Sequence, residues 1–505
     1  MKATLRALRD GRWTTVAFAV AGFAITYLQS LAFFQLAGHT FADRAAFGYS
    51  LLLEATANAA LLPPPVHPET IAGYLELRAF EPLAILFASW ALVSARARSL
   101  VPIVPRAAAF AVSTILTAAA ACVGVLAGAA SGGESVSGLG LVGAGLLLVA
   151  LALACYAISL CAGRWAAPVL LTLFFFNSLS RIFPELDVAR WLSPFRYYEL
   201  STPLPRGGDF DIAGFAVLLA IAAAGIAVAH VVATRRVAGP IVLPRATHEP
   251  SRVSLLAIPI ARELYPRRIA LAAWCVAFLV LGIVLVAATR ATMKDLLALP
   301  PGLPGLPQYI FTFVAQVLGQ TWFDVTLLLL VALTFAFVTR WADDDVSGRV
   351  EAVLSTPYSR STLVVERLAA IAVTAAVLAA VGCLAVAATS EASSLAIDST
   401  RLVAACLVLT AFGVVFAAVG VLFASWAPRA APALFGAVAL AAYLDDQIGG
   451  ALRLPGWAQN ISPFRLVGTP LASGVDGRSL GVLVAIAVAA IGSSILLIQR
   501  RDVGR

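Results

Sequence analysis

Lysine is almost absent from this 505-residue chain, where Lys2 and Lys294 are the only lysines among 35 basic residues. A P-loop requires the pattern G-x-x-x-x-G-K-[ST], in which the lysine reaches the nucleotide phosphates. Neither lysine follows the required glycines. The sequence therefore excludes an ATPase domain of the P-loop type within this chain.

Cysteine and histidine are also scarce and are arranged without a metal-binding pattern. The six cysteines lie inside apolar runs with no C-x-x-C pair, and the four histidines are scattered along the chain. Isolated cysteines in apolar runs are typical of small buried side chains. We expect no metal site and no bound cofactor in this chain.

Charged residues make up only 12% of the sequence and hydrophobic residues 61%. Soluble globular proteins have about 25% charged and about 45–50% apolar residues, so that class is excluded. Runs of about 20 apolar residues are long enough to cross a membrane as helices. The sequence predicts an all-α polytopic membrane protein with twelve spans, at 13–35, 82–95, 106–128, 138–162, 165–181, 212–234, 268–289, 323–339, 363–387, 402–426, 431–448 and 479–498.

The charges are distributed unequally between the two sides of this predicted topology. With both termini in the cytoplasm, the inner side carries 23 of the 35 basic residues and 9 of the 27 acidic residues. This asymmetry follows the positive-inside rule. The net charge of +8 therefore indicates orientation and contact with anionic lipid, and it gives no support to nucleic-acid binding.

Two similar segments lie 269 positions apart. WLSPFRYYELSTPL, which ends at Leu204, is repeated as NISPFRLVGTPL, which ends at Leu471. Each copy follows a span that opens with Ala-Pro and precedes a span that ends with Arg-Arg. This order predicts two six-span halves, residues 1–235 and 268–505, joined by a cytoplasmic linker at 236–267 that contains an interfacial helix.

The segment from Arg340 to Arg360, RWADDDVSGRVEAVLSTPYSR, is the longest predicted cytoplasmic loop within either half. We call it the docking loop. Val346, Val350, Val353 and Leu354 have the spacing of one helical face. The three aspartates before this helix are expected to cap its N-terminus, and Pro357 is expected to end it.

The docking loop resembles the loop between the second and third spans of ABC-2 type exporter permeases, in its acidic cluster, glycine, glutamate and L-S-T-P-x-S-R ending. The S-P-F segment before the last span of each half is similar to that family too. Twelve spans in two halves resemble the fused bacterial permeases that export polyketide antibiotics and other hydrophobic drugs.

This resemblance implies a permease subunit in the bacterial plasma membrane. A separate ATPase, expected in two copies, would bind ATP and Mg²⁺ and drive the export of a hydrophobic or amphipathic compound. Residues on or near the ATPase contact would be Asp343, Asp344, Asp345, Arg349, Glu351, Leu354, Ser355, Pro357 and Arg360. The corresponding first-half loop, 96–106, is shorter and has no acidic residue, so we expect a smaller contact there.

A second set of residues is predicted for the translocation path or an outer gate. Glu81 and Asp324 each lie at the start of the second span of their half. An acid in hydrocarbon costs about 2.5–3.5 kcal/mol on insertion scales and is therefore usually functional. The other candidates lie in the fifth span of each half and are Phe174, Phe175, Asn177, Tyr443 and Asp445. Ordinary packing is the alternative for each phenylalanine.

Two other functions are compatible with the composition. A secondary carrier of the major-facilitator type also has twelve spans in two halves, but the predicted spans contain no central acid for proton coupling. A polytopic membrane enzyme such as a lipid-linked glycosyltransferase could use Asp43, Glu54 or Glu69 of the first outer loop. These acids form no recognisable motif, and an enzyme leaves the duplicated halves unexplained.

Overall fold

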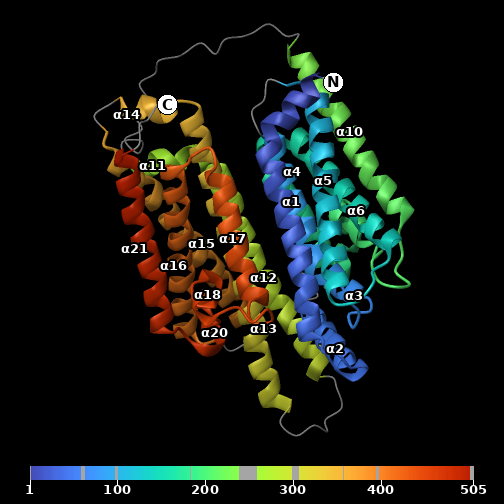
Figure 1. The fold of residues 1–505 in the computed structure, drawn as a ribbon. Helices are drawn as coiled ribbons and strands as arrows, with labels where there is room; N and C mark the ends of the chain where they lie inside the picture. The colour runs from blue at the N-terminus through green and yellow to red at the C-terminus, as the bar shows by residue number, and fades with distance from the viewer. Residues whose placement is uncertain are drawn as a thin grey trace. The chain divides into compact units, whose positions relative to one another are not determined.

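The computed structural model describes residues 2–57, 63–96, 101–181, 183–237, 259–297, 306–355, 358–393 and 397–500. It is 85% helical, and this part of the chain contains no strand. Two compact units divide the chain, Met1–Pro250 and Ser251–Arg505. Each unit is a bundle of long helices (Figure 1). The division falls inside the predicted linker, while the predicted bounds of the two halves stay a prediction.

Ten helices in the described part of the chain are long and apolar enough to cross a membrane. The prediction of an all-α polytopic membrane protein is confirmed. The two remaining predicted spans, the fifth of each half, are the shorter helices α7 (Ala166–Ser180) and α17 (Ala431–Ile448). The count of twelve spans and the cytoplasmic placement of both termini stay predictions.

Unit 1 begins with two helices of different length and direction, α1 (Lys2–Leu36) and α2 (Phe41–Ala57). The other helices of this unit are α3 (Ile71–Leu75), the π-helix η1 (Glu76–Phe80), α4 (Glu81–Arg96), α5 (Ile103–Ser131), α6 (Gly138–Ala162), η2 (Gly163–Trp165), α7, η3 (Pro184–Leu186), α8 (Asp187–Arg190), α9 (Pro194–Glu199) and α10 (Ile212–Val237).

The tightest packing in unit 1 is between α1 and α5. Thr26 in α1 donates a hydrogen bond from Oγ1 to the carbonyl oxygen of Ala121 at 2.8 Å. Gly124 and Gly128 face this side of α1, and a Cβ at Gly124 would lie 2.2 Å from Thr26 Oγ1. Small residues at every fourth position let membrane helices approach closely. The glycines of α5 therefore set the distance between these two helices.

The second span of unit 1 begins earlier than predicted. The structure has a continuous helical segment from Ile71 through η1 into α4, and the membrane-length helix is Ile71–Ala95. The predicted start at residue 82 is wrong, because the helix already runs through the acidic residues Glu76 and Glu81 that precede Pro82. Glu76 is accommodated inside the fold, where its Oε2 accepts a hydrogen bond from the Leu204 N–H at 3.2 Å.

Unit 2 repeats the order of long helices. A short helix precedes its first long helix. As in unit 1, short helices lie between the fifth predicted span and the last one. The bounds are α11 (Pro259–Leu264), η5 (Tyr265–Arg267), α12 (Arg268–Leu297), α13 (Leu306–Val346), α14 (Arg349–Leu354), α15 (Arg360–Ala392), α16 (Ser399–Trp426), α17, α18 (Gly456–Gln459), α19 (Pro463–Val467), α20 (Pro470–Ser473) and α21 (Gly477–Arg500).

The S-P-F segments form the same local structure in both units. Pro194 and Pro463 each occupy the first turn of a short helix, where the missing N–H of proline costs nothing. The phenylalanines that follow are buried. Phe195 packs against Phe174 of α7 with ring centroids 5.3 Å apart, and Phe464 packs against Tyr443 of α17 at 5.6 Å.

Candidate docking site at one end of the second unit

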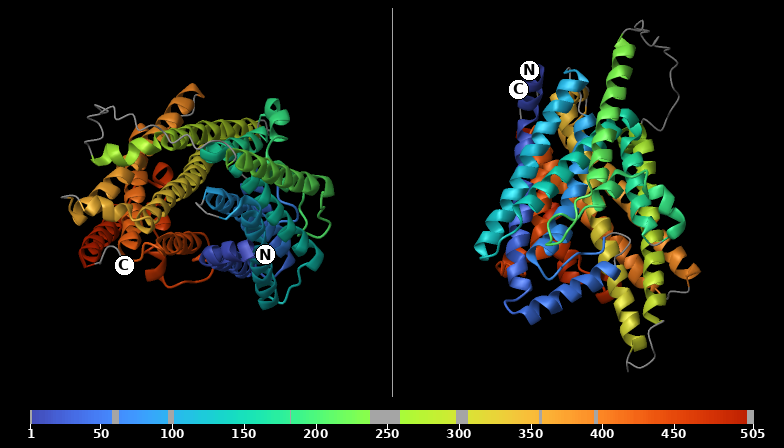
Figure 2. Two further views of the ribbon diagram at one scale, coloured as in Figure 1. Left: turned by 90° about the horizontal axis from the view of Figure 1, so that it is seen from above. Right: turned by 90° about the vertical axis from the view of Figure 1, so that its right-hand side faces the viewer.

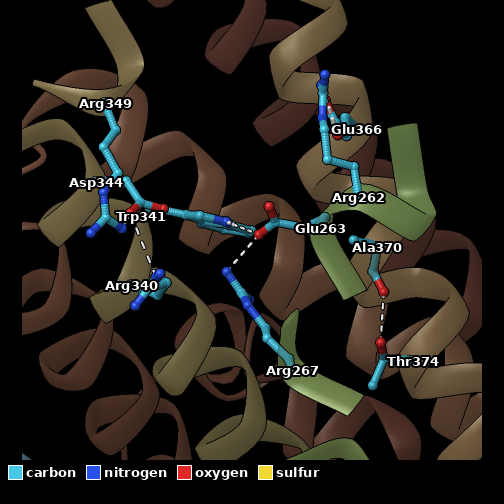
Figure 3. Close-up of polar contacts among 10 residues, drawn as sticks. All are labelled: Arg262, Glu263, Arg267, Arg340, Trp341, Asp344, Arg349, Glu366, Ala370 and Thr374. Carbon is cyan, nitrogen blue, oxygen red and sulfur yellow. Dashed lines mark hydrogen bonds and ion pairs between the residues drawn. The ribbon is translucent and has the colours of Figure 1, made fainter. Parts of the chain in front are cut away.

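Four helices of unit 2 meet at the end that contains the docking loop. Figure 3 shows that α11, α13 and α15 contribute charged side chains to one cluster there, with Arg349 of α14 at its edge. In the predicted topology this end faces the cytoplasm. The cluster connects helices that are more than a hundred residues apart in sequence, as the bond from Arg262 to Glu366 illustrates.

The three aspartates of the docking loop do not lie at the N-terminus of α14. Helix α13 continues through Val346, so Asp343, Asp344 and Asp345 lie in its last turn. Gly348 follows in the left-handed conformation with φ of +75°, and no side chain caps α14. The predicted N-terminal capping is wrong, because α13 continues until a residue without a Cβ can reverse the backbone.

Asp344 links the two helices of the docking loop. Its Oδ1 accepts a hydrogen bond from Arg349 Nη1 at 2.7 Å and forms an ion pair with Arg340 Nε at 3.5 Å. A carboxylate at a helix C-terminus is unfavourable unless cations neutralise it. The two arginines supply this charge, and the pair with Arg349 holds the start of α14 against the end of α13.

Helix α14 has one buried and one exposed side, as its hydrophobic spacing predicts. Val350 is buried, whereas Arg349, Glu351 and Ser355 are exposed and Leu354 is half-buried. The helix is shorter than predicted because Val346 belongs to α13. The surface that α14 presents to solvent is therefore polar.

Arg360 has a partner within its own unit. Its Nη1 donates hydrogen bonds to the carbonyl oxygens of Ile498 at 3.1 Å and Gln499 at 3.2 Å, at the end of α21. A cation is favourable at a helix C-terminus, where carbonyl groups lack helical partners. Arg360 thus has a structural role that its position in the motif did not predict, and Pro357 lies outside the described residues.

Glu263 of α11 contacts two helices. Its Oε1 accepts hydrogen bonds from Arg267 Nη2 at 2.6 Å and from Trp341 Nε1 at 3.1 Å (Figure 3). Trp341 is only 1% exposed, and the guanidinium of Arg367 lies 5.2 Å from the centroid of its ring. The indole therefore connects α11, α13 and α15 through one buried side chain.

Glu366 of α15 forms the second half of the cluster. Its two carboxylate oxygens accept hydrogen bonds from Arg262 Nη2 at 3.1 and 2.9 Å, and Oε2 also accepts one from the Tyr358 hydroxyl. Burial, together with the Glu366 carboxylate, raises the pKa of Tyr358 to about 12. Tyr358 therefore keeps its proton at neutral pH and remains a donor to the buried carboxylate.

The predicted outer acids occupy different places in their helices. Glu81 follows ten residues of helix, Ile71–Leu75 and Glu76–Phe80, so it does not open its span as predicted. It lies within electrostatic range of Glu199, Arg181 and Glu76. Asp324 lies two residues into the apolar segment Trp322–Asp345, although α13 itself begins at Leu306.

Asn177 lies beside two charged residues of unit 1, Glu199 and Arg181. Its Nδ2 donates a hydrogen bond to Glu199 Oε1 at 2.6 Å, and Arg181 pairs with the same oxygen. Phe175 is buried beside Asn177 in α7, whereas Phe174 is half-buried against Phe195. The structure thus brings Asn177 and Glu81 to one charged cluster, while the two phenylalanines are packing residues in this conformation.

Asp445 is unusual among the predicted residues of unit 2. Both of its carboxylate oxygens are buried and accept no hydrogen bond from the described part of the chain. Asp446 beside it does have a donor, Gln447 Nε2, at 3.2 Å. Both acids lie in the last turn of α17, where the helix dipole disfavours negative charge.

The predicted interfacial helix and the shorter first-half loop are only partly within the described residues. Residues 238–258 and 97–100 lie outside them. Within the described residues, helix α11 spans Pro259–Leu264 of the predicted linker. In the shorter loop, Arg106 Nε donates to the Tyr156 hydroxyl at 3.2 Å, which directs this arginine into unit 1.

Residues 256–497 match a family model described as "Multidrug efflux system permease Rv1217c, C-terminal domain". This match supports a multidrug exporter permease. It covers most of unit 2 and extends over the whole cluster of Figure 3. No curated protein matches the chain. Together with the ten apolar helices, the match supports a multi-pass membrane protein that acts as a transport subunit rather than an enzyme.

The sequence pattern does not predict the residues that hold this site together, among them Glu263, Trp341, Tyr358 and Glu366. One signal was present, because Glu366 and Arg367 stand at the start of an otherwise apolar run. Charged residues at such a position are usually paired. Their partners come from α11 and α13, and sequence spacing alone does not identify them. Among the described residues, no group of three or more His, Cys, Asp or Glu could hold a metal ion.

Proposed function

We propose that this chain is the permease subunit of an ATP-binding-cassette exporter of hydrophobic or amphipathic compounds in the bacterial plasma membrane. A separate ATPase, in two copies, would bind ATP and Mg²⁺. The observation that carries the proposal is the docking loop, whose α14 exposes Arg349 and Glu351 at one end of the unit. The match of this unit to an efflux permease supports the proposal.

The geometry around α14 suits the transmission of force from a docked partner. Asp344 ties α14 to α13, which is a single helix of 41 residues. At the same end, Trp341 and Glu366 tie α13 and α15 to α11. A displacement of α14 would therefore be passed to α13 and, through α11, to α15, because these charged contacts connect the four helices at one end of the unit.

The absence of a P-loop lysine in the sequence makes an external ATPase necessary for this mechanism. We assign the second and fifth helices of each unit, taken by itself, to the substrate path. Glu81, Asp324, Asn177, Tyr443 and Asp445 are the residues that we assign to the path or its outer gate, with Phe174 and Phe175 beside them in α7.

Co-purification with a P-loop ATPase encoded beside this chain tests the docking role. Glu351→Lys reverses an exposed charge on α14, and we expect this variant to retain several-fold less ATPase than the wild type. Glu391→Lys is the matched control, because Glu391 is also exposed but lies at the far end of α15. Arg360 is unsuitable for this test, since its replacement would also release the end of α21.

Efflux measurements complete the test. In vesicles that contain both subunits, export of a hydrophobic dye should require ATP and fall in Glu351→Lys but not in Glu391→Lys. Equal ATPase retention in the two variants would count against α14 as the docking surface. Export driven by a proton gradient without the ATPase would overturn the proposed energy source.

A further inference from the structure

Helix α2 of unit 1 turns Arg44 and Glu54 toward the rest of the unit, while several of its large apolar residues are turned outward. Phe41, Ala45, Tyr49 and Leu52 follow the spacing of one helical face. Three of them are strongly exposed for large side chains, Phe41 by 85%, Tyr49 by 62% and Leu52 by 42%. This arrangement is the reverse of that on a helix covering a water-soluble protein.

The opposite face of α2 is bound to the rest of unit 1. Arg44 Nη2 forms an ion pair with Glu134 Oε1 at 2.6 Å, and Glu54 Oε2 accepts a hydrogen bond from Arg78 Nη2 at 2.5 Å. Phe47 packs between these two contacts, with its ring centroid 5.8 Å from that of Tyr74. The orientation of α2 is therefore set by two charged contacts and an aromatic one.

The position of α2 places its exposed face at the membrane boundary. Only residues 37–40 separate it from the end of α1, and four residues span at most about 14 Å. The apolar part of α1, Gly11–Leu36, is longer than the ~20 residues needed to cross the hydrocarbon core, so its end reaches the headgroup region. Figure 2 (right) shows α2 running across the direction of the long helices at this end of unit 1.

The exposed apolar surface of α1 also continues onto α2. Leu36, the last residue of α1, is 47% exposed, and Phe41 begins the outward face of α2. We infer that α2 is an interfacial helix whose Phe41, Ala45 and Tyr49 face inserts among the lipids of the leaflet at this end, which is the outer leaflet in the predicted topology. A helix that lies at the headgroup boundary binds the membrane by burying its apolar face among the lipids.

This inference is independent of the proposed exporter function, and photo-crosslinking of the full chain tests it. The photoreactive residue p-benzoylphenylalanine replaces Tyr49 in one variant and Phe41 in a second, each reconstituted into nanodiscs of phosphatidylcholine and phosphatidylglycerol. Ser50 is the matched control position, because it is exposed on α2 but lies away from the apolar face. All replacements are at exposed positions, so the fold should be retained.

After irradiation, intact-protein mass spectrometry measures lipid adducts. We expect several-fold more lipid adduct at Tyr49 and Phe41 than at Ser50. Equal amounts at the three positions would show that the apolar face contacts no lipid. Adducts from Tyr49 to a peptide of this chain or of another protein would show that protein covers the face. Either of these results would overturn the inference.

Discussion

The two units share an order of helices but differ in where they place charged side chains. In unit 1 the charged contacts lie at the end that carries α2, where Glu54 binds Arg78 and Glu199 binds Asn177. In unit 2 most of the described ion pairs lie at the docking-loop end, around Glu263, Asp344 and Glu366, and Arg401 pairs with Asp398 at the other end. In the predicted topology the α2 end of unit 1 and the docking-loop end of unit 2 face opposite sides of the membrane.

This difference indicates that two bundles with the same order of long helices can place their charged contacts differently. The apolar spans and the S-P-F segments are common to both units and build the bundle. The charged clusters are expensive to bury and are retained where they connect helices. We infer that unit 2 is adapted for the ATPase contact and unit 1 for the outer side.

Replacing Trp341 by alanine should have the largest effect, because it removes the buried indole that joins three helices of unit 2. We expect the free energy of unfolding to fall by about 3–5 kcal/mol, measured by thermal or denaturant unfolding in detergent. Trp341→Phe should cost about 1 kcal/mol, mainly through the lost hydrogen bond to Glu263.

Trp165→Ala in unit 1 is the control for this comparison, since Trp165 is 46% exposed. If Trp341→Ala is no more destabilising than Trp165→Ala, the cluster does not hold unit 2 together and the contrast between the units fails.

A methyl group should cost more at the α1–α5 contact of unit 1 than at Gly382 in unit 2. Gly124→Ala places a Cβ 2.2 Å from Thr26 Oγ1 and 2.6 Å from the Phe23 carbonyl oxygen, so we expect a loss of about 1–3 kcal/mol from overpacking. Gly382→Ala in unit 2 meets Trp322 at an ordinary 3.4 Å and should cost much less. Similar losses in unfolding experiments would contradict this difference.

Asp445→Asn should stabilise unit 2, because it removes a buried carboxylate without a hydrogen-bond donor at a helix C-terminus. We expect a gain of about 1 kcal/mol in the free energy of unfolding. Asp446→Asn should give a smaller change, since Asp446 has Gln447 as its donor. A gain in stability with a loss of dye export would support the assignment of Asp445 to the transport path. Destabilisation by Asp445→Asn would show that the carboxylate has a stabilising partner.

The smallest predicted effect is a pH dependence at the start of one helix in each unit, α2 in unit 1 and α21 in unit 2. The Thr40 hydroxyl lowers the pKa of Asp43 in the first turn of α2, and the Ser479 hydroxyl lowers the pKa of Asp476 just before α21. A carboxyl whose pKa is lower in the folded state contributes stability above its unfolded pKa of about 4. This contribution is lost as the pH falls through the folded pKa.

The hydrogen-exchange protection factors of amides in the first turns of α2 and α21 should therefore fall below about pH 4. Asp43→Asn and Asp476→Asn should each remove this acid dependence in their own helix only. Unchanged acid dependence in both variants would show that other groups are responsible.

Much of the fold could be predicted from the sequence, because a membrane span requires a long apolar run whatever its neighbours are. Helix α6 has the predicted bounds, Gly138–Ala162. The start of the second span could not be predicted, since Glu76 resembles a loop residue until its bond with Leu204, distant in sequence, is known.

The sequence by itself determined the membrane class, the positions of most spans, the repeat and the absence of a P-loop lysine, because each depends on composition or local order. Only the tertiary structure decided which charged residues are paired. It placed Arg360 at the end of α21 and Glu366 beside Arg262, and it left Asp445 without a donor among the described residues. These outcomes depend on which helices lie together, and packing between distant segments sets this arrangement.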